Sequence, residues 1–248
     1  MLLPGPDSNL TRGLSVKSIF VYFVLVMFPL SMLSQPTHSR AEIVQHWCHA
    51  VEVTNGPYVD RIKGIEARLS PIVNRLHGPR IHVAVVDSDV INAWEKDLGP
   101  QESLICVPVS MIRFMGDGEG EMAFIFAHET GHALDRTCKS AEGREQITPP
   151  SFGSALSNLL GGSGRDLLAE QRTCESRADA IGFAIFTKAG YNPYDAAGAF
   201  GRLEMYNGDS GVLSKLMAFA NDHPMTPDRI AHMRKLLSSQ SLREASRQ

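Results

Sequence analysis

The fold class is decided by the stretch Phe124-Ile125-Phe126-Ala127-His128-Glu129-Thr130-Gly131-His132-Ala133-Leu134, which sets the pattern His-Glu-x-x-His in an apolar segment that favours a helix. Residues four apart lie on one face of an α-helix, so the imidazoles of His128 and His132 can point at one metal ion. Glu129 can lean toward the open side of that ion and take a proton from a water bound there. The pattern predicts a zinc hydrolase with a single Zn²⁺ in each chain.

The alternative interpretation of this stretch is a solvated helix face that happens to carry two histidines and a glutamate. The residues around them are mostly apolar, which indicates that the helix is largely buried. Buried imidazoles and carboxylates need polar partners. A metal ion would supply a partner for all three side chains, and this favours the metal site.

Composition places the chain among globular proteins. It has 248 residues, of which 43% are hydrophobic, enough to bury a core in one domain. The formal net charge of −3 gives no electrostatic reason to expect binding to nucleic acid. We therefore expect a protein or peptide substrate and no nucleic-acid partner.

The first forty residues differ from the rest. Two basic residues, Arg12 and Lys17, precede an apolar run over residues 19–33, which is broken by Pro29. The run is shorter than the roughly 20 residues that span a bilayer, and it suits the apolar region of a signal peptide.

Ser39-Arg40-Ala41 offers small residues at the spacing of a cleavage site. We therefore predict a signal peptide over residues 1–41 and a single metallopeptidase domain over residues 42–248. The alternative is an uncleaved anchor, through which the protein would make its membrane contact. In both cases the catalytic part is exported, to the periplasm or outside the cell.

Four cysteines follow the signal segment: Cys48, Cys106, Cys138 and Cys174. An even number in an oxidising compartment allows two disulfides, in three connectivities. A bridge between Cys138 and Cys174 is within reach if the two segments meet at the metal. The alternative is four buried free thiols.

Strand patterns appear at residues 81–86 and again at residues 104–109. Because Pro108 cannot donate to a strand ladder, the second strand is expected to be an edge strand or to end there. An extended substrate could add along Leu104, Ile105 and Val107 as an extra strand. An ordinary protected edge is the alternative.

Helical patterns cover most of the remaining chain. They run over residues 41–76 with a break at Asn55-Gly56-Pro57, and over 121–138, 165–189 and 194–205. A last amphipathic helix opens at Thr226-Pro227, a good N-cap and first-turn pair. Residues 140–166, rich in Gly, Pro and Ser, indicate a lid or a plain linker.

A catalytic zinc site needs a third protein ligand, and Glu175 is the candidate. Asp179 lies one turn later on the same face and can accept a hydrogen bond from the second nitrogen of a zinc-binding histidine. The alternative is a salt-bridged surface, which the apolar and small residues around the pair make less suitable.

Three motifs together resemble the gluzincin metallopeptidases related to HtpX and the CAAX prenyl endopeptidase. They are Ala127–His132, Glu175-x-x-x-Asp179 and the segment His223–Ile230. The stretch Asn92-Ala93-Trp94 is also similar to the Asn-Ala-Phe stretch of that family. The resemblance implies a mostly helical α+β domain of the zincin type, with a small sheet whose edge strand borders the zinc site.

Within that family, the chain resembles the exported, soluble, BepA-like members most. Those members carry a helical-repeat extension, which we do not expect in this chain. The resemblance also implies that His223 approaches the metal. There it would stabilise the oxyanion of the tetrahedral intermediate or occupy the open zinc position in a resting state. The alternative is a histidine that only anchors its turn.

We therefore predict a zinc-dependent endopeptidase of exported or envelope proteins, with Glu129 as general base and His223 as a second catalytic residue. One rival is a non-catalytic zinc-containing chaperone or adaptor for exported proteins. Another is a zinc hydrolase of a different substrate, such as a cell-wall peptide.

Overall fold

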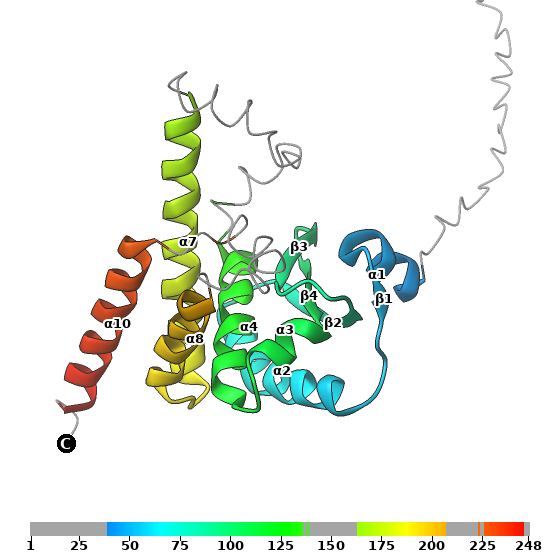
Figure 1. The fold of residues 1–248 in the computed structure, drawn as a ribbon, viewed down its shortest axis with the longest axis horizontal. Coiled ribbons are helices and arrows are strands. Elements are labelled where there is room, and N and C mark those ends of the chain that lie inside the picture. Colours follow the sequence, from blue (N-terminus) through cyan, green and yellow to red (C-terminus); the bar gives the residue numbers. More distant parts are fainter. Residues whose placement is uncertain (1–38, 136–137, 139–162, 207–222, 224–225, 246–248) are drawn as a thin grey trace, which may run out of the picture. The chain divides into compact units, whose positions relative to one another are not determined.

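A computed structural model describes residues 39–135, 138, 163–206, 223 and 226–245 (Figure 1). Nearly all of the predicted signal peptide and most of the predicted lid at 140–166 lie outside these residues. The described residues fall within one compact unit that begins at His38. Among them, no helix is both long and apolar enough to cross a membrane.

The sheet has four strands in the order β1-β2-β4-β3. Strands β2 and β4 are parallel, whereas β1 pairs antiparallel with β2, and β3 pairs antiparallel with β4. Their bounds are Val51–Glu52 for β1, Arg80–Asp87 for β2, Trp94–Gly99 for β3 and Glu102–Pro108 for β4. Both predicted strands are therefore present.

Two alternatives were expected for the strand at residues 104–109, and the structure decides between them: the strand ends at Pro108, and the edge position is wrong. Strand β4 lies between β2 and β3, so Leu104, Ile105 and Val107 are in the interior of the sheet and fully buried. Pro108 is the last residue of the strand, so its missing N–H does not interrupt the ladder. The edge beside β4 is strand β3.

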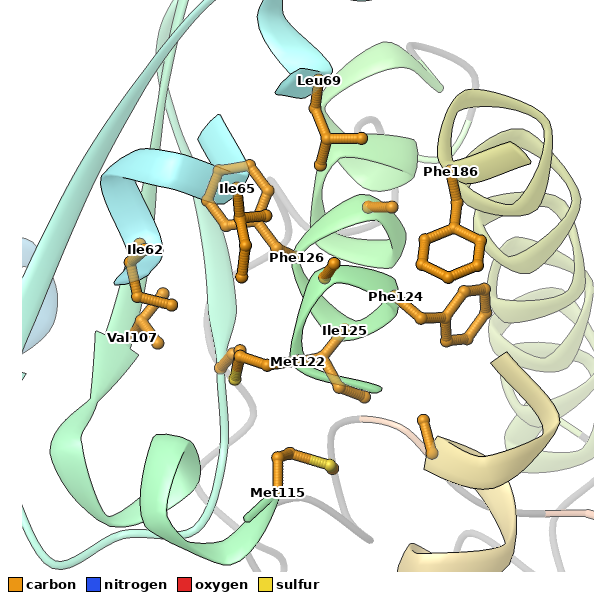
Figure 2. Close-up of a cluster of buried hydrophobic side chains, with 14 of the residues drawn as sticks. Ile62, Ile65, Leu69, Val107, Met115, Met122, Phe124, Ile125, Phe126 and Phe186 are labelled. Carbon is orange, nitrogen blue, oxygen red and sulfur yellow. The ribbon is translucent and has the colours of Figure 1, made fainter. Parts of the chain in front are cut away.

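Helices cover both faces of the sheet. Helices α2 (Pro57–Arg75), α3 (Val109–Phe114) and α4 (Glu119–Leu134) share the main core with one face (Figure 2). This core includes aromatic and branched side chains from several helices and strands: Ile62, Ile65, Leu69, Val107, Phe124 and Phe126. The face therefore supports α4 along its length, which fixes the position of the His-Glu-x-x-His pattern.

The opposite face of the sheet is covered by α1 (Arg40–Cys48). A smaller cluster forms there, in which Val44 packs with Ala84, Val86 and Leu104. A disulfide between Cys48 and Cys106, both of which belong to this cluster, joins α1 to β4. Helix α1 is therefore held to the sheet by a covalent bond as well as by apolar packing.

Three long helices complete the described fold: α7 (Ser163–Lys188), α8 (Pro193–Tyr206) and α10 (Pro227–Ala245). Helix α7 lies along α4, and α8 packs against both of them. Helix α10 packs against α7 and α8 (Figure 1). Thr226 is the N-cap of α10, as predicted. Its side chain accepts a hydrogen bond from the backbone amide of Arg229.

Candidate metal centre

Helix α4 presents His128 and His132 on one face, as their spacing predicts. Their Nε2 atoms lie 3.1 Å apart, and both side chains are buried. The helix itself ends at Leu134 rather than at the predicted Cys138, with Asp135 in the C-cap position. This earlier end does not affect the two histidines, which lie within the regular part of the helix.

A close crossing of α4 and α7 brings the third predicted ligand to the histidines. A Cβ atom on Gly131 would lie 2.4 Å from the carbonyl oxygen of Ala178, and one on Gly182 would lie 2.7 Å from that of Ala127. Because both positions are glycine, the two backbones can approach to this distance. The approach allows the side chain of Glu175 to reach α4.

Glu175 joins the two histidines directly. Its Oε2 lies 3.4 Å from Nε2 of His128, and its Oε1 lies 3.3 Å from Nε2 of His132. His223, from the segment before α10, completes the group with Nδ1 at 3.1 Å from Glu175 and 3.3 Å from His128. The structure thus brings together four buried residues that could hold one metal ion.

Asp179 makes the contact predicted for it, with Oδ1 at 2.9 Å from Nδ1 of His128. This contact leaves Nε2 of His128 directed at the ligand group, because the second ring nitrogen already faces a carboxylate. The two ring nitrogens of His128 therefore face two different carboxylates, Nδ1 that of Asp179 and Nε2 that of Glu175.

Sequence reasoning missed Arg229, which lies in the first turn of α10 and is 2% exposed. Its guanidinium binds both oxygens of Asp179 at 2.8 Å and lies 3.0 Å from Oε2 of Glu175. A sequence signal existed, since a cation in the first turn of a helix opposes the helix dipole and needs a reason. Here the reason is a pair of buried carboxylates.

The charges of the centre leave a place for a divalent cation. Glu129, Glu175 and Asp179 are buried carboxylates, and Arg229 is a buried cation. With neutral histidines, three negative charges and one positive charge leave a net charge of −2. Buried charge is stable only when it is compensated, so one divalent ion fits the donor set.

The same imbalance affects the titration of the ligands. Burial alone would lower the pKa of His128, but hydrogen bonds with Asp179 and Glu175 outweigh it and raise the pKa to about 10. Burial would raise the pKa of Glu175, but the charge of His223 and hydrogen bonds from the histidines hold it well below its usual range. Both directions indicate a site that attracts positive charge.

Glu129 is placed beside the group without belonging to it. Its side chain is 0% exposed, and Oε1 lies 3.5 Å from Nε2 of His223. Within the described part of the chain, neither of its carboxylate oxygens makes a hydrogen bond. A buried carboxylate in this state indicates that the centre accommodates a further polar molecule next to it.

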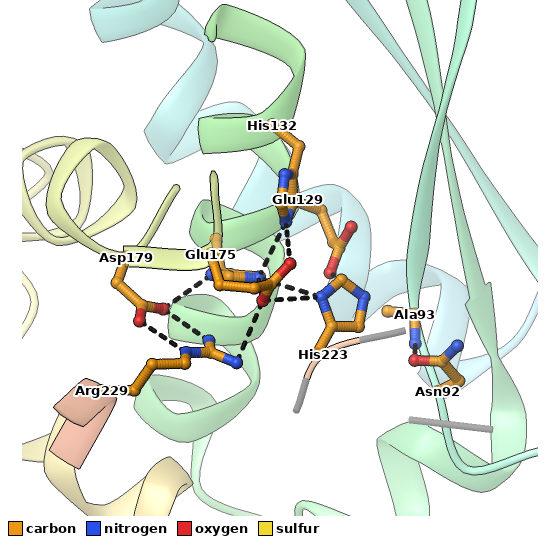
Figure 3. A network of polar contacts seen from close by, with 9 residues as sticks. Asn92, Ala93, Glu129, His132, Glu175, Asp179, His223 and Arg229 are labelled. Atoms are coloured by element: carbon orange, nitrogen blue, oxygen red, sulfur yellow. Dashed lines mark hydrogen bonds and ion pairs between the residues drawn. The ribbon is translucent and has the colours of Figure 1, made fainter. Parts of the chain in front are cut away.

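Two more predicted features can be placed. The Cys138–Cys174 disulfide is present, and it fixes the residue before Glu175 to the segment just beyond α4. In contrast, Leu104, Ile105 and Val107 lie within the sheet and not along its edge. Figure 3 shows Asn92 and Ala93, the residues that lead into β3, on the side of His223 that faces away from Glu175.

The helix-borne histidines, the third ligand from a second helix and the adjacent buried carboxylate define a metallopeptidase centre. Comparison with known proteins agrees with this class. The model of peptidase family M48 matches residues 61–237, and the chain therefore belongs to that family.

Two curated relatives are similar over parts of their lengths. The mitochondrial metalloendopeptidase OMA1 of Schizosaccharomyces pombe is 30% identical over 53% of this chain and 41% of its own length. The β-barrel assembly-enhancing protease of Yersinia pestis is 25% identical over 67% of this chain and 36% of its own length. The chain thus matches about two fifths of each relative.

Proposed function

We propose that this chain is a zinc-dependent endopeptidase that hydrolyses peptide bonds of exported or envelope proteins. The observation that carries the proposal is the buried Glu129 next to four ligand atoms from His128, His132, Glu175 and His223. A structural metal site needs only the ligands. A hydrolase also needs a base held close to the ion, and Glu129 lies in that place.

The spacing of the ligand atoms favours zinc. Tetrahedral zinc binds nitrogen and oxygen at about 2.0–2.2 Å, which separates neighbouring ligand atoms by about 3.3–3.6 Å. The close contacts here run from 3.1 Å between His128 and His132 to 3.4 Å between His128 and Glu175, and all four ligand atoms lie within 4.8 Å of one another. Two or more imidazoles with one carboxylate also form a donor set typical of zinc rather than of calcium or magnesium.

The chain's own residues divide the chemistry between them. Zinc, when bound, would polarise the peptide carbonyl and lower the pKa of water. Glu129 would accept the proton of the attacking water and pass it to the leaving amine. Asp179 keeps His128 in the orientation that presents Nε2, and Glu175 supplies the negative charge that holds the ion.

His223 has two candidate roles, and they predict opposite effects. Its Nδ1 belongs to the ligand group, which suits a resting state in which it fills the fourth position. Its Nε2 is 3.5 Å from Glu129, which suits a donor to the developing oxyanion beside the base. Replacement by alanine would raise the cleavage rate in the first case and lower it in the second.

We place the substrate along β3 rather than along β4, because β3 is the edge of the sheet beside the centre. An extended peptide could pair, as an added strand, with the side of β3 that faces away from β4. The two disulfides suit a protein of an oxidising, exported compartment, and this supports exported proteins as the substrate class.

The test is cleavage of an unfolded protein such as casein, with metal content measured on the same sample. Wild type should bind close to one zinc ion per chain and lose cleavage with a chelator. Glu129→Gln should reduce the cleavage rate by about 10²–10⁴-fold while zinc content is unchanged. Glu121→Gln, on the same helix but paired with Arg202, is the matched control and should cleave normally. Full cleavage by Glu129→Gln would refute the role of the base.

One observation favours a second candidate, a non-catalytic zinc-containing chaperone or adaptor for exported proteins. Four protein ligands are typical of structural zinc sites, whereas catalytic sites keep an open position. The two functions separate in the same assay. If the protein is a chaperone, wild type and Glu129→Gln should suppress the aggregation of an unfolded client equally well, and neither should cleave it.

A further inference from the structure

Arg229 contacts both Glu175, a candidate metal ligand, and Asp179, which contacts the ligand His128. Its Nε and Nη2 atoms bind the two carboxylate oxygens of Asp179, each at 2.8 Å, and its Nη1 lies 3.0 Å from Oε2 of Glu175. Figure 3 shows the guanidinium below both carboxylates, with contacts running to each of them. One side chain therefore touches a metal ligand and the residue that orients another ligand.

The position of Arg229 indicates that this contact is the reason for its presence. It lies in the first turn of α10, where a positive charge faces the positive end of the helix dipole. Its side chain is also 2% exposed, so its charge has little access to water. Its place at the start of the helix and its burial both destabilise the positive charge of Arg229. The negative charges of Asp179 and Glu175 offset this cost.

We propose that Arg229 is a positioning residue of the metal centre, which holds Glu175 and Asp179 in the orientation that binds the ion. The inference rests on the metal ion of the proposed function. A planar guanidinium can bind one carboxylate with two parallel bonds and still reach a second carboxylate with its third nitrogen. A lysine ammonium at the same place keeps the charge but not this fixed fork.

The competing explanation is that Arg229 merely attaches α10 to α7. In that case its replacement would lower the stability of the metal-free protein, and the metal affinity of the folded protein would not change. Phe200 of α8, whose ring centre lies 5.3 Å from the guanidinium carbon, would in the same way contribute to attaching α10 to α8. The two explanations therefore differ in metal affinity and not in stability.

The experiment compares the zinc dissociation constants of wild type, Arg229→Lys and Arg229→Met in the full chain, by competition with a chromophoric chelator. Thermal unfolding of each metal-free protein shows that it is folded. We expect both variants to bind zinc about 10–100-fold more weakly than wild type, because residues that orient metal ligands have effects of this size. The cleavage assay should show a lower kcat with an unchanged KM.

Arg202→Lys is the matched control, since Arg202 also pairs across helices but contacts Glu121 rather than a ligand. It should bind zinc as wild type does. An Arg229→Lys protein with wild-type zinc affinity would overturn the proposal, and so would two Arg229 variants that do not fold. A wild-type chain that binds no zinc would instead refute the proposed function itself, so the two failures are distinguishable.

Discussion

Gly131 of α4 lies directly against Ala178 of α7, so that a Cβ atom on the glycine would be 2.4 Å from the carbonyl oxygen of Ala178. Real side chains essentially never approach a backbone oxygen this closely, and the obstacle cannot rotate away as a flexible side chain could. The contact occurs between the two helices that carry the ligands, within one turn of His132. The distance between α4 and α7 is therefore set by the absence of a side chain.

Gly131→Ala should force the helices apart and weaken the metal centre. In the absence of other effects, the replacement of glycine by alanine stabilises a helix by about 1 kcal/mol, because alanine has less conformational freedom in the unfolded chain. Overpacking against backbone opposes this and costs about 1–3 kcal/mol. We expect lower stability in urea unfolding, together with weaker zinc binding.

Gly64→Ala provides the control for this prediction. Gly64 lies within α2, and a Cβ atom there meets nothing within 4 Å. The same chemical change should therefore stabilise the protein by about 0.4–1 kcal/mol. If both alanine variants were equally stable, the close crossing would not govern the position of Glu175.

Removal of the metal should destabilise the protein markedly. Without the ion, the buried carboxylates around Arg229 are compensated only by protons that histidines such as His128 take up, since its pKa is raised to about 10. A proton on a buried histidine compensates less charge than a divalent ion does. Ligand that binds only the folded state stabilises it by about 4 kcal/mol at a thousandfold excess over the dissociation constant. Thermal scans with and without a chelator should differ accordingly.

The His132→Ala variant is the reference for the chelator effect. With one ligand missing, its unfolding temperature should be nearly the same with and without chelator, and close to that of metal-free wild type. Superimposable scans for wild type in the two conditions would show that no structural ion is held at this centre.

The Cys138–Cys174 disulfide should matter for metal binding as well as for stability. It closes a loop between cysteines 36 residues apart and fixes the residue before Glu175. Replacement of both cysteines by alanine should cost about 2–4 kcal/mol, as judged from urea unfolding. It should also weaken zinc binding, because the segment that carries Glu175 is no longer fixed.

The Cys48–Cys106 disulfide separates these two effects. It spans 58 residues and joins α1 to β4 on the face of the sheet opposite the main core. The double alanine variant at these positions should lose comparable stability but bind zinc as wild type does. Equal zinc affinities in both double variants would count against a special role for the bridge next to Glu175.

The sequence was sufficient for the parts of the centre that depend on local spacing. His128 and His132 are four residues apart on one helix, and so are Glu175 and Asp179, so helix geometry alone predicts that each pair shares a face. The need to orient a ligand predicts a contact between Asp179 and one of the two histidines. That this histidine is His128 depends on how α7 packs against α4, and the sequence left it open.

The parts that depend on tertiary arrangement were not predictable in the same way. Strand order is set by packing, and Pro108 was compatible with an edge strand and with the last position of an interior strand. The unbroken apolar run Leu104–Val107 was the better sequence signal, because an interior strand covered on both faces shows no alternation of apolar and polar residues. The role of Arg229 depends on the packing of α10 against α7, which brings its guanidinium to Asp179 and Glu175.

Acid should destabilise the metal-free protein through Asp179. Burial alone would raise the pKa of this carboxyl, but hydrogen bonds from Arg229 and His128 outweigh burial and lower the pKa below its usual value. An unfolded chain protonates aspartate near pH 3.9. Below about pH 4 the unfolded state therefore takes up the proton first, and the stabilisation from Asp179 is lost as the pH falls through its folded pKa.

Above that pH the contribution of Asp179 is fully present and does not change. Urea unfolding in the presence of chelator, measured from pH 6 downward, should show stability falling with acid in wild type. The fall should be shallower in Asp179→Asn, with the remainder due to Glu175, whose pKa is also lowered. Asp60→Asn, on the exposed side of α2, should keep the wild-type slope. An Asp179→Asn protein with that same slope would show that the contact with Arg229 does not hold the carboxylate ionised.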